Sequence, residues 1–103
     1  MNEERTLPTL QHQVLDDATL ERLRDDLLQL TQLLEVKTRD HGALVAGDTA
    51  AAMREAFAKL LAGQTRGVQV RYRHEGQTWW DTLTPTAAGI RLTRVCVDDL
   101  SSF

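Results

Sequence analysis

Apolar and polar residues alternate with a period of two in the segment VQVRYRH (68–74), which is the pattern of a β-strand with one buried face. The next two residues, Glu75-Gly76, suit the tight turn of a β-hairpin. A two-residue turn sets the register of the two strands that it joins, so the cross-strand neighbours can be predicted. The expected pairs are Tyr72 with Trp79, Val70 with Asp81, and Val68 with Leu83.

A third strand is predicted after a looser connection at residues 85–88. Pairing Leu83 with Ile90 is the natural register for this second hairpin, because it matches two large apolar residues. The same register sets Asp81 opposite Leu92, Trp80 opposite Thr93, and Trp79 opposite Arg94. The segment therefore predicts a three-stranded antiparallel meander.

Side chains of a strand point alternately to the two faces of a sheet, so the register predicts the composition of each face. The face expected to pack on helices carries Val68, Val70, Tyr72, Trp79, Leu83, Ile90 and Leu92. The opposite face carries Gln69, Arg71, Arg73, Thr78, Trp80, Thr82, Arg91, Thr93 and Val95. The expected exposed cluster on the second face is Arg71, Arg73, Trp80 and Arg91.

Leucines recur at steps of three and four residues in the N-terminal half, which predicts one apolar face of a long helix. This helix is expected to begin at Asp16 or Asp17, whose carboxylates can cap the first turn. Gly42 is expected to end it, with Gly47 as the alternative. The seam could cover the sheet or pair with a second copy, as in a homodimer. Its members are Leu20, Leu23, Leu27, Leu30 and Leu34.

The alanine-rich segment DTAAAMREAFAKLLAG predicts a second helix, with Asp48 as its N-cap and Gly63 at its C-terminal end. The fold class expected is α+β: an N-terminal αα-hairpin, followed by the meander, with the helices packed on one sheet face. We expect residues 1–15 to form an irregular arm, residues 16–97 a single domain, and residues 98–103 a short acidic tail.

Composition adds few constraints beyond size and charge. The chain has 103 residues and a net charge of −3, with hydrophobic residues at 42%, which is ordinary for one small globular domain. The first half is acidic, whereas residues 63–97 carry five arginines against Glu75 and Asp81. With no apolar leader and one cysteine, the chain is expected to be cytoplasmic, and its compact size favours a bacterial origin.

Candidate chemistry is sparse. Asp81 falls on the predicted apolar face, where an unpaired carboxylate would be costly, so a structural ion pair with its diagonal neighbour Arg94 is expected. The histidines and Cys96 have no spacing typical of a metal site, and no phosphate-binding or nucleophile motif occurs. No catalytic residue, metal or cofactor is therefore predicted. If the chain were an enzyme or a small-ligand carrier, Asp81 and His74 would be the nearest candidates.

The exposed cluster leads to the functional hypothesis. Tryptophan and arginine are enriched where proteins contact partners, so the chain is expected to be a non-enzymatic accessory or regulatory protein. It would present Arg71, Arg73, Trp80 and Arg91 to an acidic protein partner. The alternative is a nucleic-acid-binding module that uses the same face, although a single tryptophan offers fewer stacking surfaces than RNA-binding sheets use.

Overall fold

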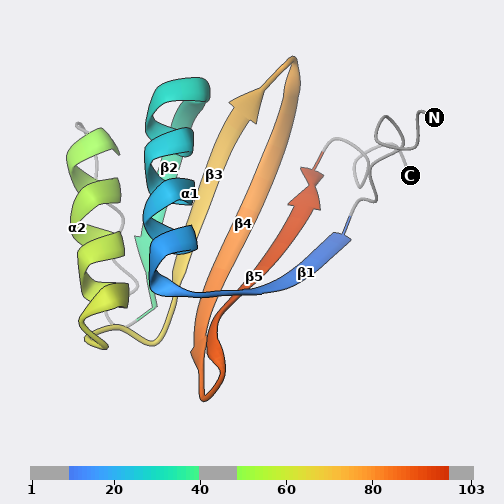
Figure 1. Ribbon diagram of the computed structural model, residues 1–103. Helices are drawn as coiled ribbons and strands as arrows, with labels where there is room; N and C mark the ends of the chain where they lie inside the picture. Colours follow the sequence, from blue (N-terminus) through green and yellow to red (C-terminus); the bar gives the residue numbers. More distant parts are fainter. Residues whose placement is uncertain (1–9, 40–48, 98–103) are drawn as a thin grey trace.

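The computed structural model describes residues 10–39 and 49–97 as two helices packed on one face of a five-stranded sheet (Figure 1). In chain order the elements are β1 (Leu10–Leu15), α1 (Asp17–Leu30), β2 (Gln32–Thr38), α2 (Thr49–Leu61), β3 (Val68–His74), β4 (Gln77–Thr86) and β5 (Gly89–Cys96). The strand order is β1-β5-β4-β3-β2, and every neighbouring pair is antiparallel. The α+β class was predicted, but the helical hairpin followed by three strands is wrong.

The predicted first helix is divided between α1 and β2. Its expected cap is present, because the Asp16 carboxylate accepts a hydrogen bond of 2.8 Å from the Thr19 amide. The helix ends at Leu30, and the next residue, Thr31, has an extended backbone and donates its hydroxyl to the Leu27 carbonyl at 2.7 Å. Neither Gly42 nor Gly47 is the end of this helix, and both lie outside the described residues.

β2 pairs with the edge of β3, which explains why the leucine spacing was misleading. A helix through residues 32–38 would leave that edge of β3 without partners for its backbone groups. As a strand, the segment satisfies them and buries Val36 opposite Val70. The four-residue spacing from Leu30, at the end of α1, to Leu34, on β2, therefore matched a helix only by coincidence.

The expectation that residues 1–15 form an irregular arm is wrong for residues 10–15, which form β1. Residues 10–15, expected to be irregular, form a strand that pairs with β5 in a continuous register from Leu10–Val95 to Leu15–Ile90. Leu15 is buried in the core at the end of this strand. The pairing joins residues about 75 to 85 positions apart, which no local pattern announces. The remaining part of the arm, residues 1–9, and the tail, residues 98–103, lie outside the described residues.

The second helix agrees with the prediction for its described part. α2 ends in a Schellman motif: the Gly63 amide bonds the Leu60 carbonyl at 3.1 Å and the Gln64 amide bonds the Lys59 carbonyl at 2.8 Å. Gly63 has a φ of +70°, which a residue without Cβ adopts at little cost. The expected cap, Asp48, lies outside the described residues.

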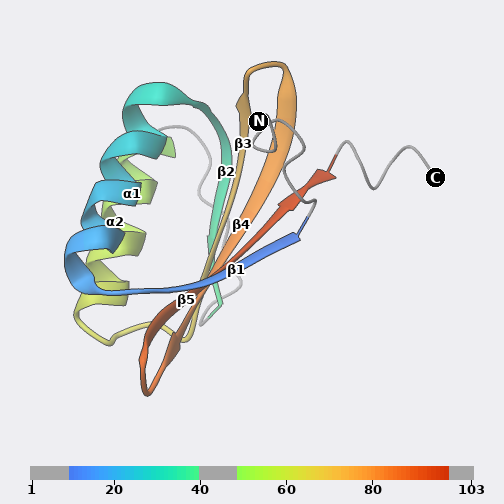
Figure 2. The same cartoon turned by 45° about the vertical axis from the view of Figure 1, so that its right-hand side comes forward.

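The core lies between the helices and the sheet (Figure 2). Leu20 and Leu27 from α1, and Met53 and Phe57 from α2, are among its buried members. Opposite them, β3 to β5 contribute the predicted inner face, whose buried residues are Val68, Val70, Tyr72, Trp79, Leu83, Ile90 and Leu92. No helix in the described ranges is long and apolar enough to span a membrane.

Candidate functional site

The first hairpin has the predicted register, which decides the faces of the two tryptophans. Tyr72 lies opposite Trp79 and Arg71 lies opposite Trp80. The turn between them contains Glu75 at φ 54° and Gly76 at φ 81°, as expected for two left-handed turn residues. Trp79 is therefore buried under the helices, and Trp80 is half-buried on the other face.

That other face has no helix of the described chain over it (Figure 2). We call it the open face. Among the described strand residues, it carries four cationic side chains and one carboxylate. These are Lys37, Arg71, Arg73, Arg91 and Glu35. Between them lie Trp80 and Val95, with a surround of threonines and Gln69.

Trp80 stands at the centre of one row across the open face. Arg71 is its neighbour on β3, and Glu35 on β2 is the neighbour of Arg71. Arg71 Nε lies 3.5 Å from Glu35 Oε1, and this Nε has no hydrogen-bond partner among the described residues. The contact is therefore a loose charge pair of the kind that contributes about 0–1 kcal/mol. Arg71 remains half-exposed beside the indole of Trp80.

Arg73 is held at the end of the hairpin. One guanidinium nitrogen donates to Thr78 Oγ1 at 2.9 Å, and the other donates to the Gly76 carbonyl at 3.1 Å. Both acceptors are neutral and the residue is exposed, so its positive charge stays available at the surface. Arg73 is thus an oriented cation one row from Trp80.

The register of the second hairpin differs from the predicted one, and this changes the position of Arg91. The observed pairs are Trp80 with Val95, Asp81 with Arg94, Leu83 with Leu92, and Thr84 with Arg91. The strand is shifted by two residues from the expected register, which keeps every side chain on its predicted face. Arg91 moves to a point four residues along the strand from Trp80, or about 13 Å. It lies on the open face but does not belong to the cluster around Trp80.

A shallow groove at the β2 side extends the cationic surface. Its lining includes Lys37, Arg39, Gln69 and Thr82. The Arg39 amide bonds the Gly67 carbonyl at 2.9 Å, and a Cβ at Gly67 would approach Arg39 Cδ to 2.6 Å. The absence of a side chain at Gly67 therefore lets the Arg39 stem lie across this loop.

Glu35, Lys37 and Arg39 were not predicted as members of this surface, because the leucine spacing placed them in a helix. A signal was available. In EVKTR (35–39), charged residues alternate with the β-branched Val36 and Thr38, which is a strand pattern. The regular leucine spacing before it outweighed this shorter signal.

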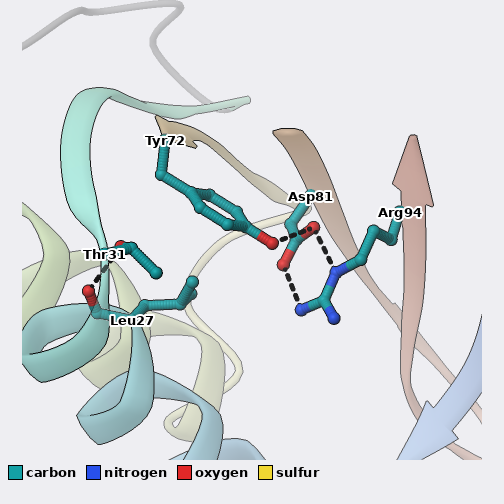
Figure 3. Close-up of polar contacts among 5 residues, drawn as sticks. All are labelled: Leu27, Thr31, Tyr72, Asp81 and Arg94. Atoms are coloured by element: carbon teal, nitrogen blue, oxygen red, sulfur yellow. Dashed lines mark hydrogen bonds and ion pairs between the residues drawn. The ribbon is translucent and has the colours of Figure 1, made fainter. Parts of the chain in front are cut away.

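On the helix-facing side, the charged residues of the sheet form a buried network (Figure 3). Asp81 has no exposed surface, and Arg94 binds it through two hydrogen bonds of 2.8 Å, from Nε and from one terminal nitrogen. The Tyr72 hydroxyl donates to the same carboxylate at 3.1 Å. Arg94 is directly opposite Asp81, and not diagonal to it as expected. This position explains the two-point contact.

The network shifts two ionisation equilibria. Burial, followed by the nearby Asp81 charge, raises the pKa of the Tyr72 hydroxyl well above its usual range. Hydrogen bonding to Asp81 raises the pKa of Arg94, so its guanidinium stays charged at any ordinary pH. Two shallow grooves on either side of Arg94 have volumes of about 160 and 170 Å³. These are smaller than typical ligand sites of roughly 300–1,000 Å³.

The remaining residues considered in the sequence, which are the leucine seam, His74 and Cys96, do not come together at one place. Leu20 and Leu27 are core residues, Leu23 is partly buried, and Leu30 is exposed. Leu34, expected in the same seam, is on β2. His74 Nδ1 lies 3.2 Å from the Leu30 carbonyl and thus joins the first hairpin to the end of α1. Cys96 is buried.

No group of three or more potential metal ligands occurs within residues 10–39 and 49–97. In comparisons with known proteins, no family model, curated protein or solved structure matches the chain.

Proposed function

We propose that the chain is a non-enzymatic interaction protein that binds an acidic segment of a protein partner through the open face. The observation that carries this proposal is the position of Trp80, half-exposed at the centre of a sheet face that neither α1 nor α2 covers, with Arg71 and Arg73 on the adjacent strand. An antiparallel sheet can have one solvated face. A half-exposed tryptophan beside two arginines on such a face has the composition that is enriched at protein interfaces.

The charges of this surface favour an anionic partner. Lys37, Arg39, Arg71 and Arg73 border the region of Trp80 and the adjacent groove, whereas Glu35 is the one carboxylate among the described residues of this surface. A partner that places carboxylates over the cations and an apolar residue against Trp80 would pair charges and bury the indole. Such aromatic and arginine anchors commonly supply most of the affinity of an interface.

A nucleic acid is the second candidate, supported by the same cations. Single-stranded nucleic acids bind sheets through successive aromatic stacking platforms. Among the described strand residues, Trp80 is the one tryptophan, tyrosine or phenylalanine on the open face. This favours a protein segment over a strand of stacked bases.

Quantitative affinity capture from the native host tests the proposal. The chain is compared with Trp80→Ala, Arg73→Ala and Arg54→Ala. Arg54 is exposed on α2 in the opposite layer, so its variant is matched to Arg73→Ala in charge. We expect Trp80→Ala and Arg73→Ala to reduce capture of an acidic protein by about tenfold or more, while Arg54→Ala retains it.

Circular dichroism and urea unfolding establish that the variants are folded. Capture that disappears after nuclease treatment, with a steep salt dependence, would identify the nucleic-acid alternative. Capture that is the same for Trp80→Ala and the original chain would contradict any role of the open face.

A further inference from the structure

The two edges of the sheet differ in how they are protected from pairing with another strand. β2 forms one edge, and its register with β3 is interrupted by a bulge between Leu33 and Glu35. It carries the charged Glu35 and Lys37, and α2 packs against it. Bulges, charges and a covering element are the devices by which natural sheets prevent edge-to-edge association.

β1 forms the other edge, and among the described residues it shows neither a bulge nor a charged lysine, arginine or carboxylate. Its sequence, LQHQVL, contains no aspartate, glutamate, lysine, arginine or proline. Its register with β5 runs without a bulge from Leu10 to Leu15. Among the described elements, β1 has a strand on one side only (Figure 1). No strand of the described residues pairs with the backbone groups on its other side.

The edge is also held in place at its C-terminal end. Leu15 is buried, and Gly89 of β5 has a φ of +142°. A Cβ at Gly89 would approach the Leu15 carbonyl oxygen to 2.8 Å and Val14 Cγ1 to 3.1 Å. Because glycine occupies this position, β1 can lie close to the end of the β4–β5 hairpin. The edge is therefore a fixed part of the sheet.

We propose that β1 pairs with β1 of a second copy of this chain, in antiparallel orientation, so that two five-stranded sheets become one continuous sheet. A two-fold axis makes such a contact self-complementary. The strand carries no carboxylate, lysine or arginine, so the pairing brings no such like charges together. Antiparallel pairing also places the exposed Asp16 and Asp17 of the two copies at opposite ends of the paired strands.

Pleating adds a constraint on the orientation of the two copies. Residues directly opposite one another in a sheet belong to the same face. Two-fold pairing through β1 therefore places both open faces on the same side of the joined sheet. Val14 is on the open face next to this contact and is 52% exposed, so a second strand would cover apolar surface there.

This contact differs from self-association through the leucine seam, which was one of the two roles that the sequence left open for that seam. Leu20 and Leu27 are committed to the core of one copy. Leu30 is 63% exposed at the end of α1 and Leu34 is 36% exposed on the protected edge. These two leucines provide matched controls, because a lysine at either position adds the same charge away from β1.

The experiment measures the mass of the full chain in solution by light scattering and sedimentation across a range of concentrations. We expect a dimer of twice the 11.6 kDa chain. Val14→Lys is expected to raise its dissociation constant by about tenfold or more. Leu30→Lys and Leu34→Lys are expected to leave it unchanged. Circular dichroism checks that each variant is folded.

A spin label at Gln13, which is exposed on β1, gives an independent measurement. Two labels close together across the axis are expected, whereas labels at Arg54 on α2 should be far apart. A monomer at the highest accessible concentration would overturn the proposal. So would a dimer that Leu30→Lys or Leu34→Lys disrupts and Val14→Lys does not, or distant Gln13 labels within a dimer.

Discussion

Replacement of Arg94 by methionine tests the energetic role of the buried network. The variant keeps most of the side-chain volume but removes the two hydrogen bonds of 2.8 Å to Asp81. Asp81 has no exposed surface, so water cannot replace them. The Tyr72 hydroxyl, at 3.1 Å, would be the carboxylate's one remaining donor among the side chains of the network.

Removal of one partner from a buried ion pair typically costs about 3–5 kcal/mol, because the other charge is left uncompensated. The whole free energy of unfolding of a small domain is about 5–15 kcal/mol. We therefore expect Arg94→Met to lose a large fraction of the stability. Arg91→Met is the matched control: it removes the same charge from an exposed position on the same strand and should change stability by less than about 0.5 kcal/mol.

Urea unfolding followed by tryptophan fluorescence and by circular dichroism measures these differences. A triple variant, Tyr72→Phe with Asp81→Leu and Arg94→Met, replaces the whole network by apolar side chains. It is expected to recover most of the loss, because buried ion pairs can be exchanged for packed apolar groups at little cost. A loss below about 1 kcal/mol for Arg94→Met would refute the reasoning. A triple variant as unstable as the single one would refute it equally.

Two further predictions concern the first hairpin. Tyr72 is the single tyrosine, and its pKa is raised in the folded state. The unfolded state therefore loses the proton first, so stability is retained below about pH 10 and falls above it by up to about 1.4 kcal/mol per pH unit. Ultraviolet absorbance should show tyrosinate appearing together with unfolding, and tyrosinate formation in a chain that is still folded would contradict this. Glu75 has a φ of 54°, and Glu75→Asn should recover part of the roughly 1–2 kcal/mol cost of that conformation, seen as a higher urea midpoint. An unchanged or lower midpoint would show that the turn is not strained.

The contrast between the two hairpins shows where local information was sufficient. Glu75-Gly76 permits one tight turn, so the pairs from Val68–Leu83 to Tyr72–Trp79 were predicted and are confirmed. The connection at residues 85–88 imposes no such limit, and apolar matching of Leu83 with Ile90 gave the wrong register. Each side chain of the second hairpin still lies on its predicted face, because the register was wrong by two residues, which is an even number.

By itself, the sequence determined the elements whose cause is local: the Asp16 cap, the described part of α2 with its Gly63 terminus, the first hairpin, and the alternation that separates Trp79 from Trp80. Tertiary structure decided what depends on distant backbone groups. In the meander of β3 to β5 alone, the outer edges of β3 and β5 would have backbone groups without hydrogen-bond partners. Residues 32–38 and 10–15 pair with these edges, and both segments have weak local signals for a strand. The pairing of those edges placed Glu35 and Lys37 on the open face and left β1 at the margin of the sheet. Hydrogen bonds between strands are formed only after the chain has folded back, so their energy is not encoded in any short stretch of residues.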